Sequence, residues 1–288
     1  MMTSDCSKPV PSIPKETARA ANAIFGRSNF YIVIGEHLET ILEGIQCKHL
    51  TEKECESTLD GSIWALITFF QFIEGLTDVQ AVDAVRTRID WKFALRLSMI
   101  PARFHEYAFC EFRQRMLIDA FSQGEFQKLM DRLTTLVPSF KANFQNLDSL
   151  EVVASVCSVN RLNHAQQAMN QTLAVLAAKF PDWLRKIALP HWYGRYSHAS
   201  ARFEVAMLLG QQRFLMEEIG ADIHHLLGKI HQSGSSEIGE LHEVVALSQL
   251  WSQQFKALNL APNHWHENLN LKDCGTCAYR GAGRRRPL

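Results

Sequence analysis

Residues 62–97 constrain the fold of this chain more than any other stretch, because their first part is apolar on almost every side. Between residues 63 and 74 the apolar run is interrupted at Thr68, Gln71 and Glu74, and this spacing of three places the polar residues on one narrow stripe. A helix that is apolar on all its other faces is surrounded by protein. The stretch therefore predicts a central core helix.

Two more short helices are predicted after the core helix. Gly75 suits the left-handed position that ends a helix, and Thr77 followed by Gln80 matches the capping box that begins one. The second helix is predicted to bury a stripe of Val79, Val82, Val85 and Ile89. The third is predicted to bury Trp91, Ala94 and Leu95. Three short helices joined by tight turns fit a helix-turn-helix, and they fit equally a small helical bundle with a solvated basic face.

The rest of the chain also shows helical spacing and predicts a mainly α protein. Prolines in residues 1–14 predict an extended lead-in before a helix at residues 15–25. Apolar residues three and four apart predict further helices over residues 32–50, 106–121, 125–137, 162–180, 199–220, 221–231 and 237–258. Residues 139–147 alternate in character and predict a short strand, so the fold is expected to contain at most a few short strands.

The charge balance limits how the protein can interact with nucleic acid. The 288 residues contain 30 Lys plus Arg and 30 Asp plus Glu, so the formal net charge is zero. Nucleic-acid-binding domains are commonly basic, and any DNA contact must therefore come from a local patch. The length allows one or two domains, and a chain with 47% hydrophobic and 21% charged residues is ordinary for a soluble globular protein.

Cysteine usage and hydropathy predict a soluble, cytoplasmic protein with no membrane segment. The seven cysteines are odd in number and irregularly spaced, which favours reduced thiols in the cytosol. The longest apolar run, residues 63–73, is too short to span a bilayer, and no leader pattern is expected at the start. Cys274 and Cys277, with His264 and His266 upstream, are a weak indication of a metal site, because they supply only one CxxC pair.

The sequence also resembles a known family. Residues 69–97, FFQFIEGLTDVQAVDAVRTRIDWKFALRL, followed by CEFRQRML at residues 110–117, are similar to the InsH-type N-terminal domain of bacterial insertion-sequence transposases. The family pattern runs E-G-L-[ST]-D-x-Q-A, then A-V-R-x-R-I-D-W-K-[YF], then S-E-F-R-x-R-L. Residues 13–40 resemble the lead-in of the same domain. The resemblance implies a DNA-binding domain that recognises terminal inverted repeats in double-stranded DNA.

Under this resemblance six basic residues are candidates for contacts with DNA phosphates and base edges. They are Arg86, Arg88, Lys92, Arg96, Arg113 and Arg115. The alternative is that half of them form intramolecular ion pairs, because acidic residues lie among them. Those acids are Asp83, Asp90, Glu106 and Glu111.

Asp148 is the candidate catalytic residue and metal ligand. Residues 148–162, DSLEVVASVCSVNRL, resemble the family segment whose Asp is the first carboxylate of a DDE triad, on the first strand of a ribonuclease-H-like core. The resemblance implies three carboxylates that hold two Mg²⁺ ions, one at the nucleophile and one at the leaving oxygen. Leu150 and Glu151 replace the Thr-His of the family. The alternative is an exposed Asp148 that caps the helix after it.

The other two acids of the triad would follow the helical insertion that residues 151–258 resemble, and the chain ends there. The resemblance therefore implies a truncated transposase that retains end recognition, lacks the complete active site and does not bind Mg²⁺ by itself. The alternatives are a non-catalytic inhibitor of transposition and a decayed gene product without activity. Such an inhibitor would bind the same DNA ends, or would dimerise with itself or with full-length transposase.

This interpretation divides the chain into four parts. Residues 1–14 are expected to be a flexible lead-in, and residues 15–140 the InsH-type DNA-binding domain. Residues 141–260 are expected to form a partial transposase core with its helical insertion. Residues 261–288 lose helical periodicity, and an aberrant tail without order is expected there.

Overall fold

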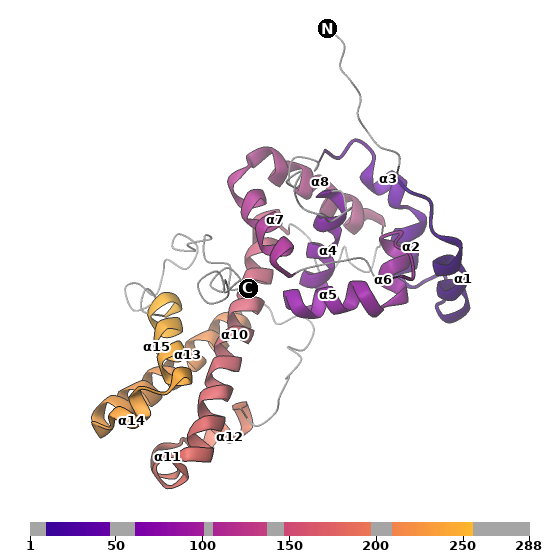
Figure 1. The fold of residues 1–288 in the computed structure, drawn as a ribbon. Coiled ribbons are helices and arrows are strands. Elements are labelled where there is room, and N and C mark those ends of the chain that lie inside the picture. Colours follow the sequence, from indigo (N-terminus) through magenta and orange to yellow (C-terminus); the bar gives the residue numbers. More distant parts are fainter. Residues whose placement is uncertain (1–9, 47–60, 101–105, 137–146, 197–208, 256–288) are drawn as a thin grey trace, which may run out of the picture. The chain divides into compact units, whose positions relative to one another are not determined.

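The computed structural model describes residues 10–46, 61–100, 106–136, 147–196 and 209–255. In these residues every regular element is an α-helix and no strand is present, which confirms the mainly α fold (Figure 1). The strand predicted at residues 139–147 lies almost entirely outside the described residues, as does the tail after residue 260. By internal contacts the chain divides into two compact units, Met1–Val156 and Cys157–Leu288.

The first unit is built around the predicted core helix. Its helices are α1 (Lys15–Ile24), α2 (Phe30–Glu36), α3 (Leu38–Leu42), α4 (Gly61–Glu74), α5 (Asp78–Thr87), α6 (Ile89–Ala94), α7 (Glu106–Ile118) and α8 (Ala120–Leu136). Every residue of α4 from Gly61 to Gln71 is buried, including the polar Thr68. The central position of this helix is therefore confirmed, and Figure 1 shows α4 among the other helices of the unit.

Two local features of α2 position it against α6. Asn29 caps α2, because its Oδ1 accepts hydrogen bonds from the backbone N–H groups of Tyr31 (2.9 Å) and Ile32 (3.3 Å). Further along α2, a Cβ atom at Gly35 would lie 2.6 Å from the ring of Phe93 and 2.7 Å from its carbonyl oxygen. These distances are far below van der Waals contact, so the absence of a side chain at this position allows α2 and α6 to approach closely.

Two helix predictions in this unit are wrong. The helix predicted over residues 32–50 is two shorter helices, because the backbone at His37 (φ −102°, ψ 11°) departs from helical geometry between α2 and α3. Val79, predicted to be buried, is 52% exposed. Asp78 takes the inward position in the first turn of α5, and Val79, one residue later, therefore points outward. The buried apolar face of α5 consists of Ala81, Val82, Ala84 and Val85.

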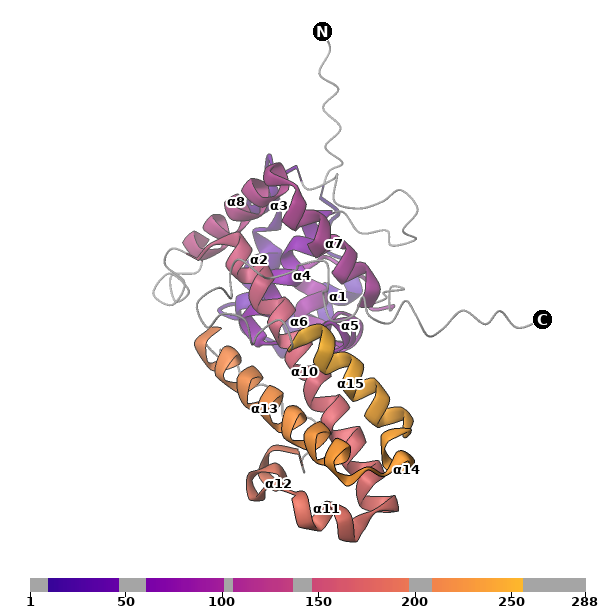
Figure 2. The same ribbon diagram turned by 90° about the vertical axis from the view of Figure 1, so that its left-hand side faces the viewer.

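The second unit packs α10, α13 and α15 around one apolar core. Its helices are α10 (Ser149–Lys179), which begins in the first unit, α11 (Pro181–Ile187), α12 (Pro190–Tyr196), α13 (Leu209–Ser233), α14 (Ser236–Gly239) and α15 (His242–Gln254). The predicted apolar positions Leu162, Ala165, Met169 and Leu176 are buried in this core. They share one cluster with Ile219, Ile223, Leu226, Leu247 and Leu250 of α13 and α15 (Figure 2).

The helix break predicted between residues 220 and 221 is also wrong, because α13 runs through both residues. A Cβ atom at Gly220 would lie 2.6 Å from the ring of Phe255, so this glycine makes room for the end of α15 instead of ending a helix. Pro181 and Pro190 each occupy the first position of a short helix, where proline is tolerated. Among the described helices, none is long and apolar enough to cross a membrane.

Candidate nucleic-acid interface

The turn between α4 and α5 is closed as the sequence predicts. Gly75 has φ 62°, the left-handed conformation, and the N–H of Leu76 donates to the carbonyl of Gln71 at 3.0 Å. In the capping box, the backbone N–H of Gln80 donates to the Thr77 hydroxyl at 3.3 Å. The N–H of Thr77 donates to Gln80 Oε1 at 2.9 Å. The two helices of the predicted helix-turn-helix-like element are thus joined by a tight turn with satisfied backbone groups.

Arg113, a candidate DNA contact, lies in the interior of the first unit. Its Nη2 is 2.6 Å from Asp78 Oδ2, and its Nη1 donates to Gln71 Oε1 at 3.3 Å. Gln71 Nε2 in turn donates to Asp78 Oδ1 at 2.9 Å. Both side chains of the ion pair are 0% exposed, and the three side chains come from α4, α5 and α7. A pair buried this deeply connects the three helices and presents no charge at the surface.

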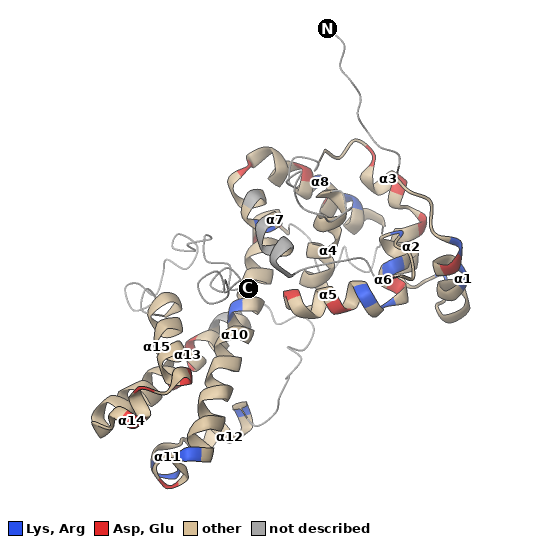
Figure 3. Cartoon of the chain, in the orientation of Figure 1, with Lys and Arg blue, Asp and Glu red and all other residues tan. Residues whose placement is uncertain are grey.

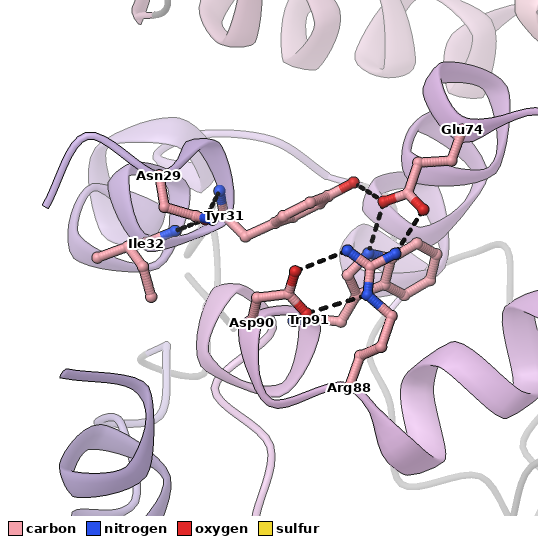
Figure 4. Close-up of polar contacts among 7 residues, drawn as sticks. All are labelled: Asn29, Tyr31, Ile32, Glu74, Arg88, Asp90 and Trp91. Carbon is pink, nitrogen blue, oxygen red and sulfur yellow. Dashed lines mark hydrogen bonds and ion pairs between the residues drawn. The ribbon is translucent and has the colours of Figure 1, made fainter. Parts of the chain in front are cut away.

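Arg88 lies between α5 and α6 in a cluster of polar and aromatic side chains (Figure 4). Its guanidinium pairs with Glu74 and donates two hydrogen bonds, of 2.6 and 3.0 Å, to Asp90. Glu74 also accepts hydrogen bonds from the Tyr31 hydroxyl and, at 3.1 Å, from Trp91 Nε1. Two acids and one base give the cluster an excess of negative charge. The cluster as a whole therefore repels a DNA phosphate while both carboxylates hold Arg88.

Two aromatic rings also hold the guanidinium of Arg88. Its Cζ lies 5.1 Å from the ring centre of Tyr31 and 5.2 Å from that of Trp91, within the range of cation–π attraction. Burial acts to lower the pKa of Arg88, but hydrogen bonds to Asp90 and Glu74 outweigh it and raise that pKa above its ordinary value. Burial, and then the charge of Glu74, raise the pKa of the Tyr31 hydroxyl. The cluster therefore combines a charged arginine with a neutral tyrosine at neutral pH.

Lys92 and Arg96, on and just after α6, are almost completely buried. Lys92 is 4% exposed, its Nζ donates to the carbonyl of Met99 at 2.8 Å, and burial lowers its pKa. Arg96 is 8% exposed. Its guanidinium donates to the carbonyl of Gly35 at 3.2 Å and pairs with Glu39 at 2.8 Å. In this structure both cations connect α6 to neighbouring segments of the first unit.

Among the described residues, internal ion pairs hold several of the six candidates, and a DNA contact by any of the six stays a prediction. The paired residues are Arg88, Arg96 and Arg113. Asp90 is one of the expected partners, but Glu39, Glu74 and Asp78 are not, because they are distant in sequence from the bases they hold. The polar stripe on α4 could have revealed two of these networks, since polar groups on a buried helix require polar partners.

Other cations of the first unit are more accessible. Arg86 is half-buried in the last turn of α5, and Arg115 lies in α7, where its side chain is outside the described residues. Sequence reasoning missed the exposed Lys15 and Arg19 on α1 and the exposed Arg27 just after it. Lys15 and Arg19 are four residues apart and therefore share one face of α1. Since α1 packs on α6 and buries Thr17 and Ala21, this basic face is the solvent side of α1.

Asp148 is exposed and immediately precedes α10. Its Oδ1 accepts a hydrogen bond from the backbone N–H of Leu150 at 3.2 Å, and its carbonyl accepts one from Val152 at 3.1 Å. The side chain therefore caps a helix, as the alternative predicts. The chain from Ser149 onward is helical where the resemblance implies a strand. A catalytic role for Asp148 stays a prediction.

The Asp148 carboxylate accepts hydrogen bonds from the Ser149 hydroxyl and the Leu150 N–H as a helix cap. In the part of the chain that the structure describes, no three His, Cys, Asp or Glu side chains lie together as a metal site requires. Cys274, Cys277, His264 and His266 lie outside the described residues.

Comparison with known proteins gives one match. Residues 20–115 match the model of a family described as "Transposase domain (DUF772)". The matched range begins within α1 and ends within α7, so it includes the α4–α5–α6 element and all six basic candidates. The match supports a transposase-family protein. Searches of curated proteins and of solved structures give no match.

Proposed function

We propose that this chain, whose residues 20–115 match a transposase domain, binds double-stranded DNA at the terminal inverted repeats of an insertion sequence. The observation that carries the proposal is the family match across α1 to α7, which agrees with the resemblance to the InsH-type domain. A transposase has to hold the ends of its element before it can move them. A short helix after a tight turn, such as α5, is a common means of reaching a DNA groove.

In this proposal the accessible cations contact the DNA. Lys15, Arg19 and Arg27 reach phosphates from the α1 side, and Arg86 does so from α5. Arg115 of α7 stays a candidate on the resemblance alone. Because the net charge of the chain is zero, such a local group must supply the electrostatic attraction. Four other bases hold the helices in place: Arg88, which is half-buried, and the buried Lys92, Arg96 and Arg113.

DNA cleavage by this chain alone is not part of the proposal. The DDE mechanism implied by the resemblance uses three carboxylates around two Mg²⁺ ions. Asp148, the residue assigned to that triad, serves as a helix cap in this structure. We therefore propose that this chain alone binds the element ends without cutting them.

The capping role of Asp148 also favours a second candidate function, that of an inhibitor. A protein that occupies the terminal repeats without cutting them competes with active transposase for the same DNA. Incubation of the pure protein with Mg²⁺ and a supercoiled plasmid carrying the repeats is expected to leave the plasmid uncut. Nicking at the repeat ends would exclude the inhibitor and the binding-only proposal together.

Fluorescence anisotropy with two duplexes of equal length tests the proposed function. One duplex carries the terminal inverted repeat and the other carries the same bases in scrambled order. The wild-type chain is expected to bind the repeat on the order of 10³-fold more tightly at physiological salt, the low end of specific protein–DNA recognition. Equal affinity for the two duplexes would contradict end recognition.

A charge-reversal pair identifies the contact surface. Lys15→Glu with Arg19→Glu is expected to weaken binding to both duplexes. It should also reduce the slope of log affinity against log salt by about two, because each cation neutralises one phosphate. Lys229→Glu is the control, since Lys229 lies on α13 in the second unit and makes a hydrogen bond of 3.4 Å with Gln232. An unchanged salt slope in the double variant would place the DNA elsewhere.

A further inference from the structure

The corner formed by the end of α10 and by α11 carries exposed cations that the proposed function does not use. We call Lys179, Arg185 and Lys186 the basic corner; all three are exposed. None of the residues of α11 is fully buried, but Trp183, Leu184 and Ile187 pack partly against the core of the second unit. The apolar side of α11 is thus anchored, and its charged side faces solvent.

Charge is distributed unevenly within the second unit. From Lys179 to Tyr196 the chain contains four basic residues and one acidic residue. From Leu209 to Gln254 it contains six acidic residues and two basic ones. In Figure 3 the blue segments of α11 contrast with the red segments at α14. A chain with no net charge therefore concentrates positive charge at one corner of this unit.

The cations of this region differ in how they are held. Arg195 is held by two internal ion pairs, one with Asp222 and one, at 2.7 Å, with Glu218. Arg185 pairs with Asp182 at 2.9 Å, but both side chains are highly exposed, and such pairs are weak. Lys179 and Lys186 are exposed and, among the described residues, no ion pair involves them. Their position in the last turns of α10 and α11 suits the helix dipole but leaves the ammonium groups accessible.

An exposed aromatic side chain follows the basic corner. Tyr193, on α12, is 83% exposed, whereas its neighbour Trp192 is buried. Only residues 188 and 189 separate α11 from α12. The side chain of Asp222 fixes α12 on α13, because it accepts a hydrogen bond from the Tyr196 hydroxyl at 2.8 Å and pairs with Arg195. Tyr193 is therefore presented to solvent from a helix that is held in place.

We propose that the basic corner is a second DNA-binding surface, which contacts phosphates through Lys179 and Lys186 and stacks an unpaired base on Tyr193. Exposed cations and an exposed aromatic ring are the combination that binds single-stranded nucleic acid: the cations neutralise phosphates and the ring stacks on a base. Tyr193 follows Lys186 by seven residues in the chain. The inference rests on the proposed function and deepens it. It assigns to the second unit a preference for DNA ends with unpaired bases.

Anisotropy titrations of the full chain with two DNAs test this surface. One is a blunt duplex, and the other is the same duplex with a short single-stranded overhang. Lys186→Glu is compared with Lys229→Glu, which makes the same charge change on α13 of the same unit. Tyr193→Ala is compared with Phe214→Ala, because Phe214 is also an exposed aromatic residue on α13.

The two variants are expected to separate the contribution of the Lys186 charge from that of the Tyr193 ring. Lys186→Glu should weaken binding to both DNAs and lower the salt slope by about 0.7 to 0.9, the value of one phosphate contact. Tyr193→Ala should weaken binding to the overhang DNA about tenfold, within the range of one base stacked on an aromatic side chain, and leave the blunt duplex unchanged. Both control variants should match the wild type.

The outcomes distinguish this inference from the proposed function. If Lys15→Glu with Arg19→Glu weakens binding while Lys186→Glu and Tyr193→Ala match their controls, the basic corner is not a DNA surface and the proposed function stands. If the wild-type chain binds neither DNA, both fail. If Lys186→Glu abolishes binding to vesicles with anionic lipids but not to DNA, the corner binds a membrane surface and the inference is wrong.

Discussion

The two units of this protein build their polar clusters from opposite charges. In the first unit one cation, Arg88, is shared by two carboxylates, Glu74 and Asp90. In the second unit one carboxylate, Asp222, is shared by several donors. They are His191, Arg195 and Tyr196. The first cluster thus has an excess of acid and the second an excess of hydrogen-bond donors.

This difference indicates which cations of each unit are not held by the acids of a polar cluster. Arg88, Arg96 and Arg113 of the first unit are engaged by acids, so its free positive charge lies mainly on and beside α1. In the second unit a single buried acid organises α12, and the lysines of the basic corner remain at the surface. The two surfaces proposed to bind DNA therefore consist of cations that belong to neither polar cluster.

The largest effect on stability is expected for the fully buried Arg113–Asp78 pair. Arg113→Met is expected to lower the free energy of unfolding by about 3–5 kcal/mol, because it leaves the carboxylate of Asp78 buried without its cation. Urea denaturation at neutral pH measures the effect. Arg185→Met removes an exposed pair and is expected to change the same quantity by less than about 0.5 kcal/mol. Similar losses in the two variants would show that burial does not set the strength of these pairs.

The second test removes the charge at the centre of the second cluster. Asp222→Asn is expected to cost about 2–3 kcal/mol, since hydrogen bonds to a charged acceptor weaken together. Burial raises the pKa of Asp222, but hydrogen bonds from His191, Tyr196 and Arg195 outweigh it and hold that pKa below its ordinary value. The stabilisation is therefore present above about pH 4 and is lost as the pH falls through the lowered pKa.

Urea titrations of wild type and Asp222→Asn at several pH values check this dependence. The stability of the wild type should decrease below about pH 4 more steeply than that of the variant. If the stability of both proteins depends on pH in the same way, the hydrogen bonds to the Asp222 carboxylate do not stabilise the fold.

The smallest effect is expected in the first cluster. Tyr31→Phe removes one of the donors to Glu74 and is expected to cost about 1 kcal/mol, because Arg88 and Trp91 still bind that carboxylate. The folded pKa of Tyr31 is raised, so its contribution is complete below about pH 10 and is lost as the pH rises above that value. Thermal unfolding between pH 9 and 11 should therefore show a steeper loss for the wild type than for the variant. Tyr193→Phe is the control, because Tyr193 is 83% exposed.

The features that could be predicted from sequence are those fixed within a few residues. The buried α4, the left-handed Gly75 and the capping box of Thr77 and Gln80 depend on near neighbours in the chain. The partners of the candidate cations could not be found this way, because Asp78 and Arg113 meet only after α5 and α7 have packed. Tertiary contacts also moved Val79 to the surface, since the inward position beside it belongs to Asp78.

The same limit applies to the candidate site. A net charge of zero limits any DNA contact to a local patch, but the resemblance could not separate accessible cations from structural ones. Lys15 and Arg19 lie four residues apart and so share a helical face, but they are outside residues 69–117, where the pattern of the family places its basic residues. Burial, which only the fold provides, makes the distinction.

Gly35 performs two tasks that constrain any movement of the first unit. Its missing side chain admits the ring of Phe93, and its carbonyl accepts a hydrogen bond from Arg96 just after α6. A sliding or a rotation of α2 along α6 would break the second contact and collide at the first. The two helices are therefore expected to move as one rigid block. If the unit binds DNA as proposed, any adjustment occurs at the edges of this block and not within it.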